Sequence, residues 1–155
     1  NDLLLAGSHL LGLRDKATTE NDQGWISSCI YSPILGHYIG LGFIKGKVKK
    51  FKVHSRNSAK YPVPKIGWNN IIMNGSSWEK TLLCNNANGD FMYFVHSYYV
   101  EPQMKDVILS STIYGNTEYC SSIQQNNIFA CQFHPEKSGE IGLNIYKNLK
   151  KNHCS

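Results

Sequence analysis

A histidine and a glutamate two residues apart are the side chains of this sequence best suited to chemistry. His134 and Glu136 lie in the stretch Gln132-Phe133-His134-Pro135-Glu136-Lys137-Ser138, directly after the apolar run Ile128-Phe129-Ala130-Cys131. The apolar run predicts a strand that ends at the proline-containing turn, with His134 at the edge of a sheet. From there Glu136 can fold back onto one imidazole nitrogen and fix the tautomer of the ring. The pattern therefore predicts the base and the orienting group of a catalytic triad.

The nucleophile of such a triad is the missing member. The chain has 5 cysteines, an odd number without any CxxC spacing, which favours reduced thiols over a disulfide framework or a zinc site. Cys29 has no flanking glycines, and Cys131 lies on the same predicted strand as His134 but too far along it. Both are interpreted as ordinary buried or surface thiols.

The motif His134-Pro135-Glu136-Lys137-Ser138-Gly139 resembles the C-terminal motif of class I (triad) glutamine amidotransferases, and is most similar to that of the glutaminase subunit of imidazole glycerol phosphate synthase. Three more segments match this family in the family's order: Gly40-Leu41-Gly42-Phe43-Ile44-Lys45-Gly46, Val63-Pro64-Lys65-Ile66-Gly67-Trp68-Asn69 and Tyr93-Phe94-Val95-His96-Ser97-Tyr98. Each motif alone is short, and His134 alone would more often be a structural histidine. The shared order is what supports the resemblance.

The resemblance implies an α/β, flavodoxin-like class I glutamine amidotransferase fold in a single domain, residues 1–155. Because the chain begins without the family's opening βα segment, we expect this fold to be incomplete at the N-terminal side. Asn74-Gly75, Asn88-Gly89 and Tyr114-Gly115-Asn116 are turn signals that suit hairpins, so we expect an antiparallel excursion in the middle. Strands are expected near residues 3–5, 34–35, 47–53, 71–73, 91–100, 107–110, 122–125 and 128–133.

Two further segments have clear periodicity. Ile141, Ile145 and Leu149 recur at helical spacing, which predicts a terminal helix beginning near Gly139.

The net charge of +5 is concentrated in lysines between residues 45 and 65, where charged and apolar residues alternate over 47–53. No nucleic-acid motif accompanies these lysines. The pattern favours an exposed edge strand, or a surface for an acidic partner.

The region before residue 46 resembles the family in a damaged form. Ala6-Gly7-Ser8-His9 departs from the Pro-Gly-x-Gly of the family's oxyanion loop, and residues 23–26 are expected to be helical. The family's Gly-x-Cys-x-Gly elbow is replaced by Gly36-His37-Tyr38-Ile39-Gly40, with Tyr38 at the place of the nucleophile. Because Gly40 also begins the next motif, no residues remain for the elbow helix. A deletion explains both observations.

The resemblance implies a glutaminase subunit that hydrolyses glutamine and supplies ammonia to a synthase subunit of the (β/α)8-barrel type, in imidazole glycerol phosphate synthesis and hence histidine biosynthesis. The alternative is an inert remnant or a partner-binding module, because the cysteine is absent. By resemblance, Ser97 and Tyr98 contact the backbone groups of glutamine, and the synthase interface contains Lys65, Trp68, Asn69, Tyr93 and Lys137.

The sequence also carries expectations about cofactors and location. The resemblance implies no metal and no organic cofactor. Apolar runs at residues 3–5 and 10–13 are too short to span a bilayer, and no basic segment with a cleavage site precedes them. We therefore expect a cytoplasmic protein that binds neither membrane nor nucleic acid.

Overall fold

The computed structural model describes residues 9–10, 24–32, 37–44, 46–52, 60–75, 77–126 and 128–150. The structure divides the chain into two compact units, residues 1–46 and 47–155, and a single domain over residues 1–155 stays a prediction. Each unit is therefore described by itself. The strands expected near residues 3–5 and 34–35, and the oxyanion loop up to Ser8, lie outside the described residues.

The first unit contains three antiparallel strands, β1 (His9–Leu10), β2 (Gly24–Ser32) and β3 (His37–Ile44), in the order β1-β2-β3. The helix expected at residues 23–26 is wrong, because Gly24 begins β2. This segment is rich in the β-branched and aromatic residues that suit a pleated strand. Tyr38 lies inside β3, where it is paired with Tyr31 of β2.

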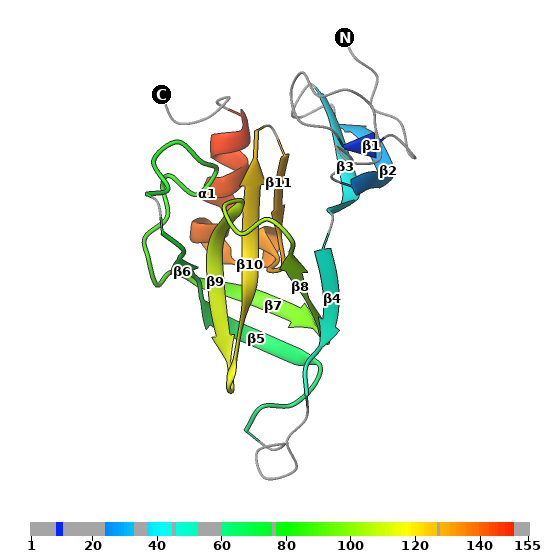
Figure 1. The fold of residues 1–155 in the computed structure, drawn as a ribbon. Helices are drawn as coiled ribbons and strands as arrows, with labels where there is room; N and C mark the ends of the chain where they lie inside the picture. The colour runs from blue at the N-terminus through cyan, green and yellow to red at the C-terminus, as the bar shows by residue number, and fades with distance from the viewer. Residues whose placement is uncertain are drawn as a thin grey trace. The chain divides into compact units, whose positions relative to one another are not determined.

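The second unit is built on a sheet with the strand order β4-β8-β10-β9-β6, with β11 also paired to β10 (Figure 1). Its strands are β4 (Gly46–Lys50), β6 (Ile72–Met73), β8 (Tyr98–Pro102), β9 (Ile108–Tyr114), β10 (Thr117–Gln125) and β11 (Ile128–Cys131). The expected hairpin at Gly115 is confirmed, since Tyr114 pairs with Thr117 and Gly115 has a φ of +61°.

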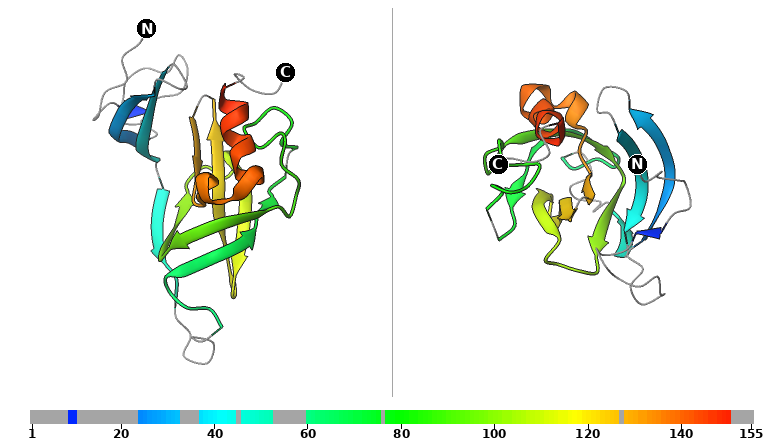
Figure 2. Two further views of the ribbon diagram at one scale, coloured as in Figure 1. Left: turned by 180° about the vertical axis from the view of Figure 1, so that it is seen from behind. Right: turned by 90° about the horizontal axis from the view of Figure 1, so that it is seen from above.

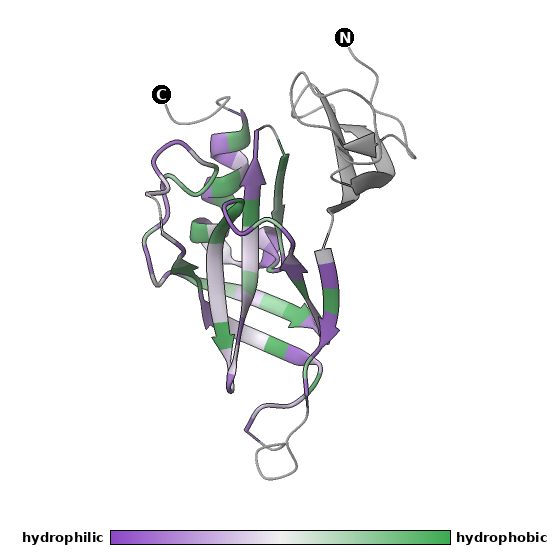
Figure 3. Ribbon diagram, viewed as in Figure 1, coloured by the Kyte–Doolittle hydropathy of each residue, from purple (hydrophilic) through white to green (hydrophobic). Residues whose placement is uncertain are grey.

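Strand β4 confirms the expected edge strand. All of its residues are exposed, it ends the strand order, and it is largely hydrophilic in Figure 3. Lys49 forms an ion pair with Glu101 of β8, with 2.8 Å between Nζ and Oε2. Exposed lysines along an edge strand oppose pairing with another chain.

A separate two-stranded ribbon consists of β5 (Lys65–Asn70) and β7 (Phe91–His96), paired antiparallel from Lys65 opposite His96 to Asn70 opposite Phe91. In Figure 1 this ribbon crosses β9 and β10 at a steep angle. The sequence does not predict β5, and it predicts one strand over residues 91–100 where the structure has β7 and β8 separated at Ser97.

The core of the second unit lies between this ribbon, the sheet and the terminal helix. The inner face of β7 contributes Met92 and Phe94, which are fully buried, and the helix contributes Ile145. The expected terminal helix is confirmed as α1 (Gly139–Lys150), which follows the short 3-10 helix η1 (Pro135–Lys137). In the reverse view of Figure 2, α1 lies in front of the strands.

The expectation of an α/β domain with antiparallel strands in the middle is confirmed. The antiparallel share is larger than expected, because every strand pairing with a described register is antiparallel, and α1 is the one α-helix of the described residues. The parallel strands of a flavodoxin-like sheet stay a prediction. Among the residues described, no helix has the length and apolarity needed to cross a membrane.

Gly142 yields the first testable prediction. A Cβ atom on Gly142 would collide with the carbonyl oxygen of Pro135 and would lie 2.6 Å from Cβ of Ser138. We expect Gly142→Ala to destabilise the fold by about 1–3 kcal/mol, because η1 and α1 would have to separate. Leu143→Ala, at a position 44% exposed on the same helix, is the control. Denaturant unfolding measures both, and equal stability of the two variants would contradict the prediction.

Candidate functional site

His134 and Glu136 form the pair that the sequence predicts. Nδ1 of His134 lies 2.8 Å from Oε1 of Glu136, and their side chains are 38% and 50% exposed. Because Nδ1 is engaged by the carboxylate, Nε2 is the nitrogen that can take or give a proton on a substrate. The geometry is that of a base with its orienting group.

The charge state of Glu136 reflects this contact. Partial burial acts to raise the pKa of Glu136, but hydrogen bonds from its own backbone N–H and from His134 outweigh it, so the pKa is lowered. The carboxylate is therefore ionised at neutral pH, the state in which it can orient an imidazole and stabilise its protonated form.

The turn that carries the pair is set locally. Pro135 takes the first position of η1, where its fixed φ suits a helix start and its missing N–H leaves no bond unmade. The N–H of Lys137 donates to the carbonyl of His134 at 3.0 Å. Ser138 then precedes α1, and its carbonyl accepts from the N–H of Gly142 at 3.2 Å. His134 is thus held between a strand and two consecutive helices.

Tyr93 fastens this turn to the ribbon. Its carbonyl accepts from the N–H of His134 at 2.8 Å, and its N–H donates to Oγ of Ser138 at 3.0 Å. The same Oγ donates to the carbonyl of His134 at 2.6 Å. A serine just before a helix is a recognisable start signal in a sequence, but its bond to β7 is not. Sequence reasoning therefore missed Ser138 as a supporting residue.

Ser97 and Tyr98, the predicted glutamine contacts, lie where β7 ends and β8 begins. The carbonyl of Ser97 accepts from the N–H of Phe51 at 3.1 Å, and the carbonyl of Tyr98 lies 2.9 Å from Nδ1 of His96. The Tyr98 side chain is 53% exposed, with Nζ of Lys50 5.8 Å from its ring centroid. This Ser97–Tyr98 turn is therefore held mainly through its backbone.

Neither Cys120 nor Cys131 is an activated nucleophile. Burial raises the pKa of both Cys120 and Cys131 to about 12, so these free thiols stay protonated at neutral pH. Cys84 is disulfide-bonded, so the expectation of reduced thiols is wrong at this position. Within the described part of the chain, no three His, Cys, Asp or Glu side chains gather as metal ligands would.

The predicted partner residues occupy two different environments. Trp68 is 55% exposed, and its ring lies 5.8 Å from the ring of Tyr93 on the neighbouring strand. Asn69 is half-buried and donates from Nδ2 to the carbonyl of Ile113 at 2.9 Å, and Lys137 is exposed. Lys65, by contrast, is 2% exposed. A place for Lys65 at an interface stays a prediction, and in this structure its side chain is turned inward.

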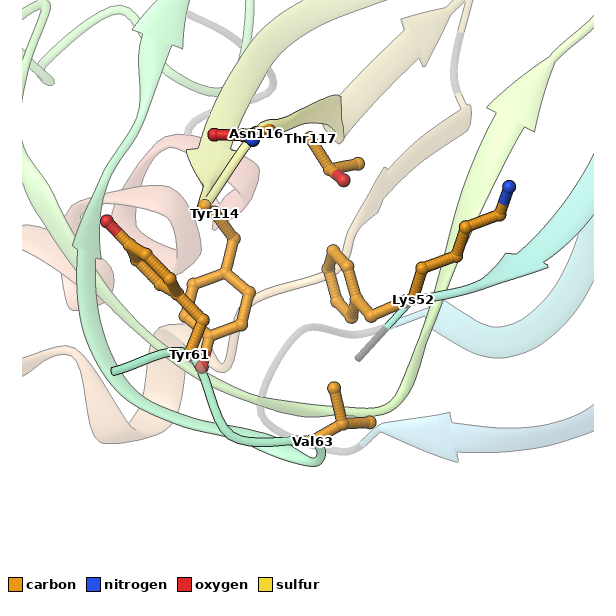
Figure 4. A pocket seen from close by; sticks show the side chains of 8 residues that line it. Lys52, Tyr61, Val63, Tyr114, Asn116 and Thr117 are labelled. Carbon is orange, nitrogen blue, oxygen red and sulfur yellow. The ribbon is translucent and has the colours of Figure 1, made fainter. Parts of the chain in front are cut away.

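A small hollow in the second unit holds none of the predicted site residues. It has a volume of about 30 Å³ and is lined by residues 51, 52, 61 and 63 and by the β9–β10 hairpin, with Lys52, Tyr61 and Tyr114 among the lining side chains (Figure 4). The hydroxyl of Tyr114 donates to the carbonyl of Pro62 at 2.7 Å. A space of this volume has room for ordered water, and none of the predicted site residues lines it.

Comparison with protein families shows which family this chain belongs to. Residues 34–150 match the class-I glutamine amidotransferase family, which is more than half of the chain. The chain belongs to that family. The His134–Glu136 pair lies inside the matched region, together with η1 and most of the second unit.

Individual relatives of this chain agree with the family match. The imidazole glycerol phosphate synthase subunit HisH of Chlorobium luteolum is 42% identical over 115 residues, which are 74% of this chain and 53% of the relative. The same subunit of Chlorobium chlorochromatii is 40% identical over 146 residues, 92% of this chain and 63% of the relative. That of Pyrococcus furiosus is 42% identical over 112 residues, 72% of this chain and 53% of the relative. The chain thus spans a little over half the length of these relatives.

The pairing of His134 with Glu136 gives a second prediction. In His134→Ala, the hydrogen bond and the charge that help to lower the pKa of Glu136 are removed, so this pKa should rise. An NMR titration of the Glu136 side-chain carboxyl measures it. Lys147→Ala on α1 is the control and should leave the pKa unchanged. An unaltered Glu136 titration in His134→Ala would mean that the pair does not form in solution.

Proposed function

We propose that this chain is an amidotransferase domain of the glutaminase-subunit type, with glutamine as the ammonia source for imidazole glycerol phosphate synthesis in histidine biosynthesis. The observation that carries the proposal is the His134–Glu136 pair, 2.8 Å apart in a turn bonded to β7. The names of the relatives support the pathway. Because the chain spans only part of their length, the activity of the whole protein is itself a proposal.

The chemistry of the proposed reaction needs a thiolate, a base and an oriented substrate. A cysteine thiolate attacks the side-chain amide carbon of glutamine, and Nε2 of His134 gives a proton to the departing ammonia, which leaves a glutamyl thioester. His134 then takes a proton from water, which attacks the thioester and releases glutamate and the thiol. Glu136 holds His134 in place through Nδ1, and Ser97 and Tyr98 hold the backbone groups of glutamine.

The identity of the nucleophile decides between a domain that turns over glutamine and one that only binds its partner. A nucleophile elbow places its residue on a sharp turn between a strand and a helix. Tyr38, at the expected place, lies inside β3 and is paired across the hairpin with Tyr31. A phenol with an ordinary pKa near 10 is also a poor substitute for a thiolate. We therefore propose that this chain keeps the partner-binding role of the amidotransferase domain but does not itself turn over glutamine.

Glutaminase activity is the third prediction. We expect no glutamate release from glutamine by the chain or by Tyr38→Cys, because a cysteine within β3 lacks the helix N-terminus that favours a thiolate. The assay compares both proteins with and without a synthase subunit. His134→Ala is the control that separates true turnover from background. Turnover in the unmodified chain that disappears in His134→Ala would sink the prediction.

The proposed partner is a synthase subunit of the (β/α)8-barrel type, in a cytoplasmic heterodimer. The outer face of the β5–β7 ribbon supports an interface with it. Two cross-strand pairs, Ile66 with Val95 and Trp68 with Tyr93, lie on this face, and Ile66, Trp68 and Val95 are 61%, 55% and 40% exposed. Exposed apolar and aromatic side chains in one cluster are the composition found at the centre of protein interfaces. Lys137, which is exposed close to His134 in the sequence, would add a charged group.

Binding of the synthase subunit is the fourth prediction. Truncating a tryptophan at an interface centre typically costs about 2 kcal/mol or more, so Trp68→Ala should weaken binding roughly 30-fold. Val48→Ala on β4, where the side chain is 67% exposed, should bind like the unmodified chain. Isothermal titration calorimetry with the synthase subunit measures the affinities. Equal affinities for the two variants would place the interface elsewhere.

A further inference from the structure

Lys65 is a buried amine that pairs with no carboxylate of the described residues. Its side chain is 2% exposed, and Nζ lies 3.7 Å from the ring centroid of Phe94. Nζ donates to the hydroxyl oxygen of Tyr119 at 2.8 Å. In the part of the chain that the structure describes, no carboxylate forms an ion pair with it. Burying a charge that only aromatic rings and one hydroxyl compensate is costly, so the position of Lys65 needs an explanation.

The hydroxyl of Tyr119 continues the contact to the Ser97–Tyr98 turn. It lies 3.3 Å from Nε2 of His96, and Nδ1 of the same imidazole lies 2.9 Å from the carbonyl oxygen of Tyr98. Phe51 contacts both Tyr119 and the Ser97–Tyr98 turn. Its ring packs edge-on against that of Tyr119, with 5.3 Å between the ring centroids, and its N–H donates to the carbonyl of Ser97. Side chains from β5, β7 and β10 thus converge on the turn between β7 and β8.

The direction of these hydrogen bonds is determined by chemistry. A carbonyl oxygen only accepts, so Nδ1 of His96 must carry a proton, and in a neutral imidazole Nε2 is then an acceptor. The hydroxyl of Tyr119 must therefore donate to His96 and accept from Lys65. An ammonium group has donors and no acceptor, so it permits this direction and forbids the reverse.

We propose that Lys65 is a positioning residue: by making Tyr119 donate to Nε2 of His96, it reinforces the Nδ1–H tautomer that bonds the Tyr98 carbonyl, and so supports the backbone of the Ser97–Tyr98 turn. This inference rests on the proposed function in one respect: that function makes the Ser97–Tyr98 turn the contact for glutamine. It makes Lys65 an internal support of the Ser97–Tyr98 turn rather than a contact with the partner.

The charge on Lys65 gives this arrangement a dependence on pH. Burial lowers the pKa of Lys65 to about 7. A neutral amine has a lone pair, so above this pKa Tyr119 can turn its proton toward Lys65 and release His96. Among the residues that the structure describes, the titratable groups next to Lys65 are His96 of β7, Tyr114 of β9 and Tyr119 of β10. Burial lowers the pKa of His96, as do the charges of Lys65 and His134, and burial raises the pKa of both tyrosines, so these three groups stay neutral while Lys65 titrates.

The test is an NMR titration of the full chain with ¹⁵N-labelled histidine, between about pH 6 and pH 8.5. At the acidic end we expect His96 as the Nδ1–H tautomer, with a change in its ring signals and in the Tyr98 amide as the pH rises through about 7. Lys65→Met should lose that pH-dependent change. Tyr119→Phe should lose the change and weaken the tautomer preference, which then rests on the Tyr98 carbonyl alone.

Controls keep the outcomes distinct. Tyr99→Phe removes a hydroxyl from the same aromatic cluster, where the ring lies 5.6 Å from that of Tyr119, and should behave like the unmodified chain. An Nε2–H tautomer of His96, or a pH-dependent change that survives in Lys65→Met, would overturn the proposal. Addition of L-glutamine is a separate arm. If glutamine leaves the Ser97 and Tyr98 amides unmoved while the tautomer results hold, the glutamine contact fails and the positioning role of Lys65 stands.

Discussion

One strand, β7, holds together the parts of the second unit that bear on function. One edge of β7 is paired with β5 along its whole length, and at Tyr93 its backbone also bonds to the turn that carries His134. Its inner face supplies Met92 and Phe94 to the core. Buried backbone groups have to find partners, and the His134 turn provides them for Tyr93. The position of His134 therefore depends on β7 as much as on its own segment.

This arrangement joins regions that would otherwise be independent. Tyr93 bonds the His134 turn with its backbone and presents its side chain next to Trp68 on the outer face of the ribbon. At the end of the same strand, His96 bonds the backbone of Tyr98. A displacement of β7 would therefore reach the histidine, the Ser97–Tyr98 turn and the outer face together.

Features that depend on neighbouring residues could be predicted from the sequence. The His134–Glu136 contact spans two residues, and the apolar period of α1 is contained in its own segment. Features that depend on distant partners could not. Strand β5 contains lysine, glycine and two asparagines, which are poor strand formers, and it is a strand because β7 pairs with it. The burial of Lys65 has no local signal either, because the hydroxyl that accepts its hydrogen bond is 54 positions away.

The short span of the His134–Glu136 contact also bears on how such a chain can change over generations. The pair is made by one turn, and that turn is held by Pro135, Ser138 and Tyr93 for reasons of folding alone. Selection for a stable domain would therefore preserve the turn itself, but it would not by itself preserve the two half-exposed side chains that the turn presents. The survival of His134 and Glu136 together is a property of the site and not of the packing beneath it.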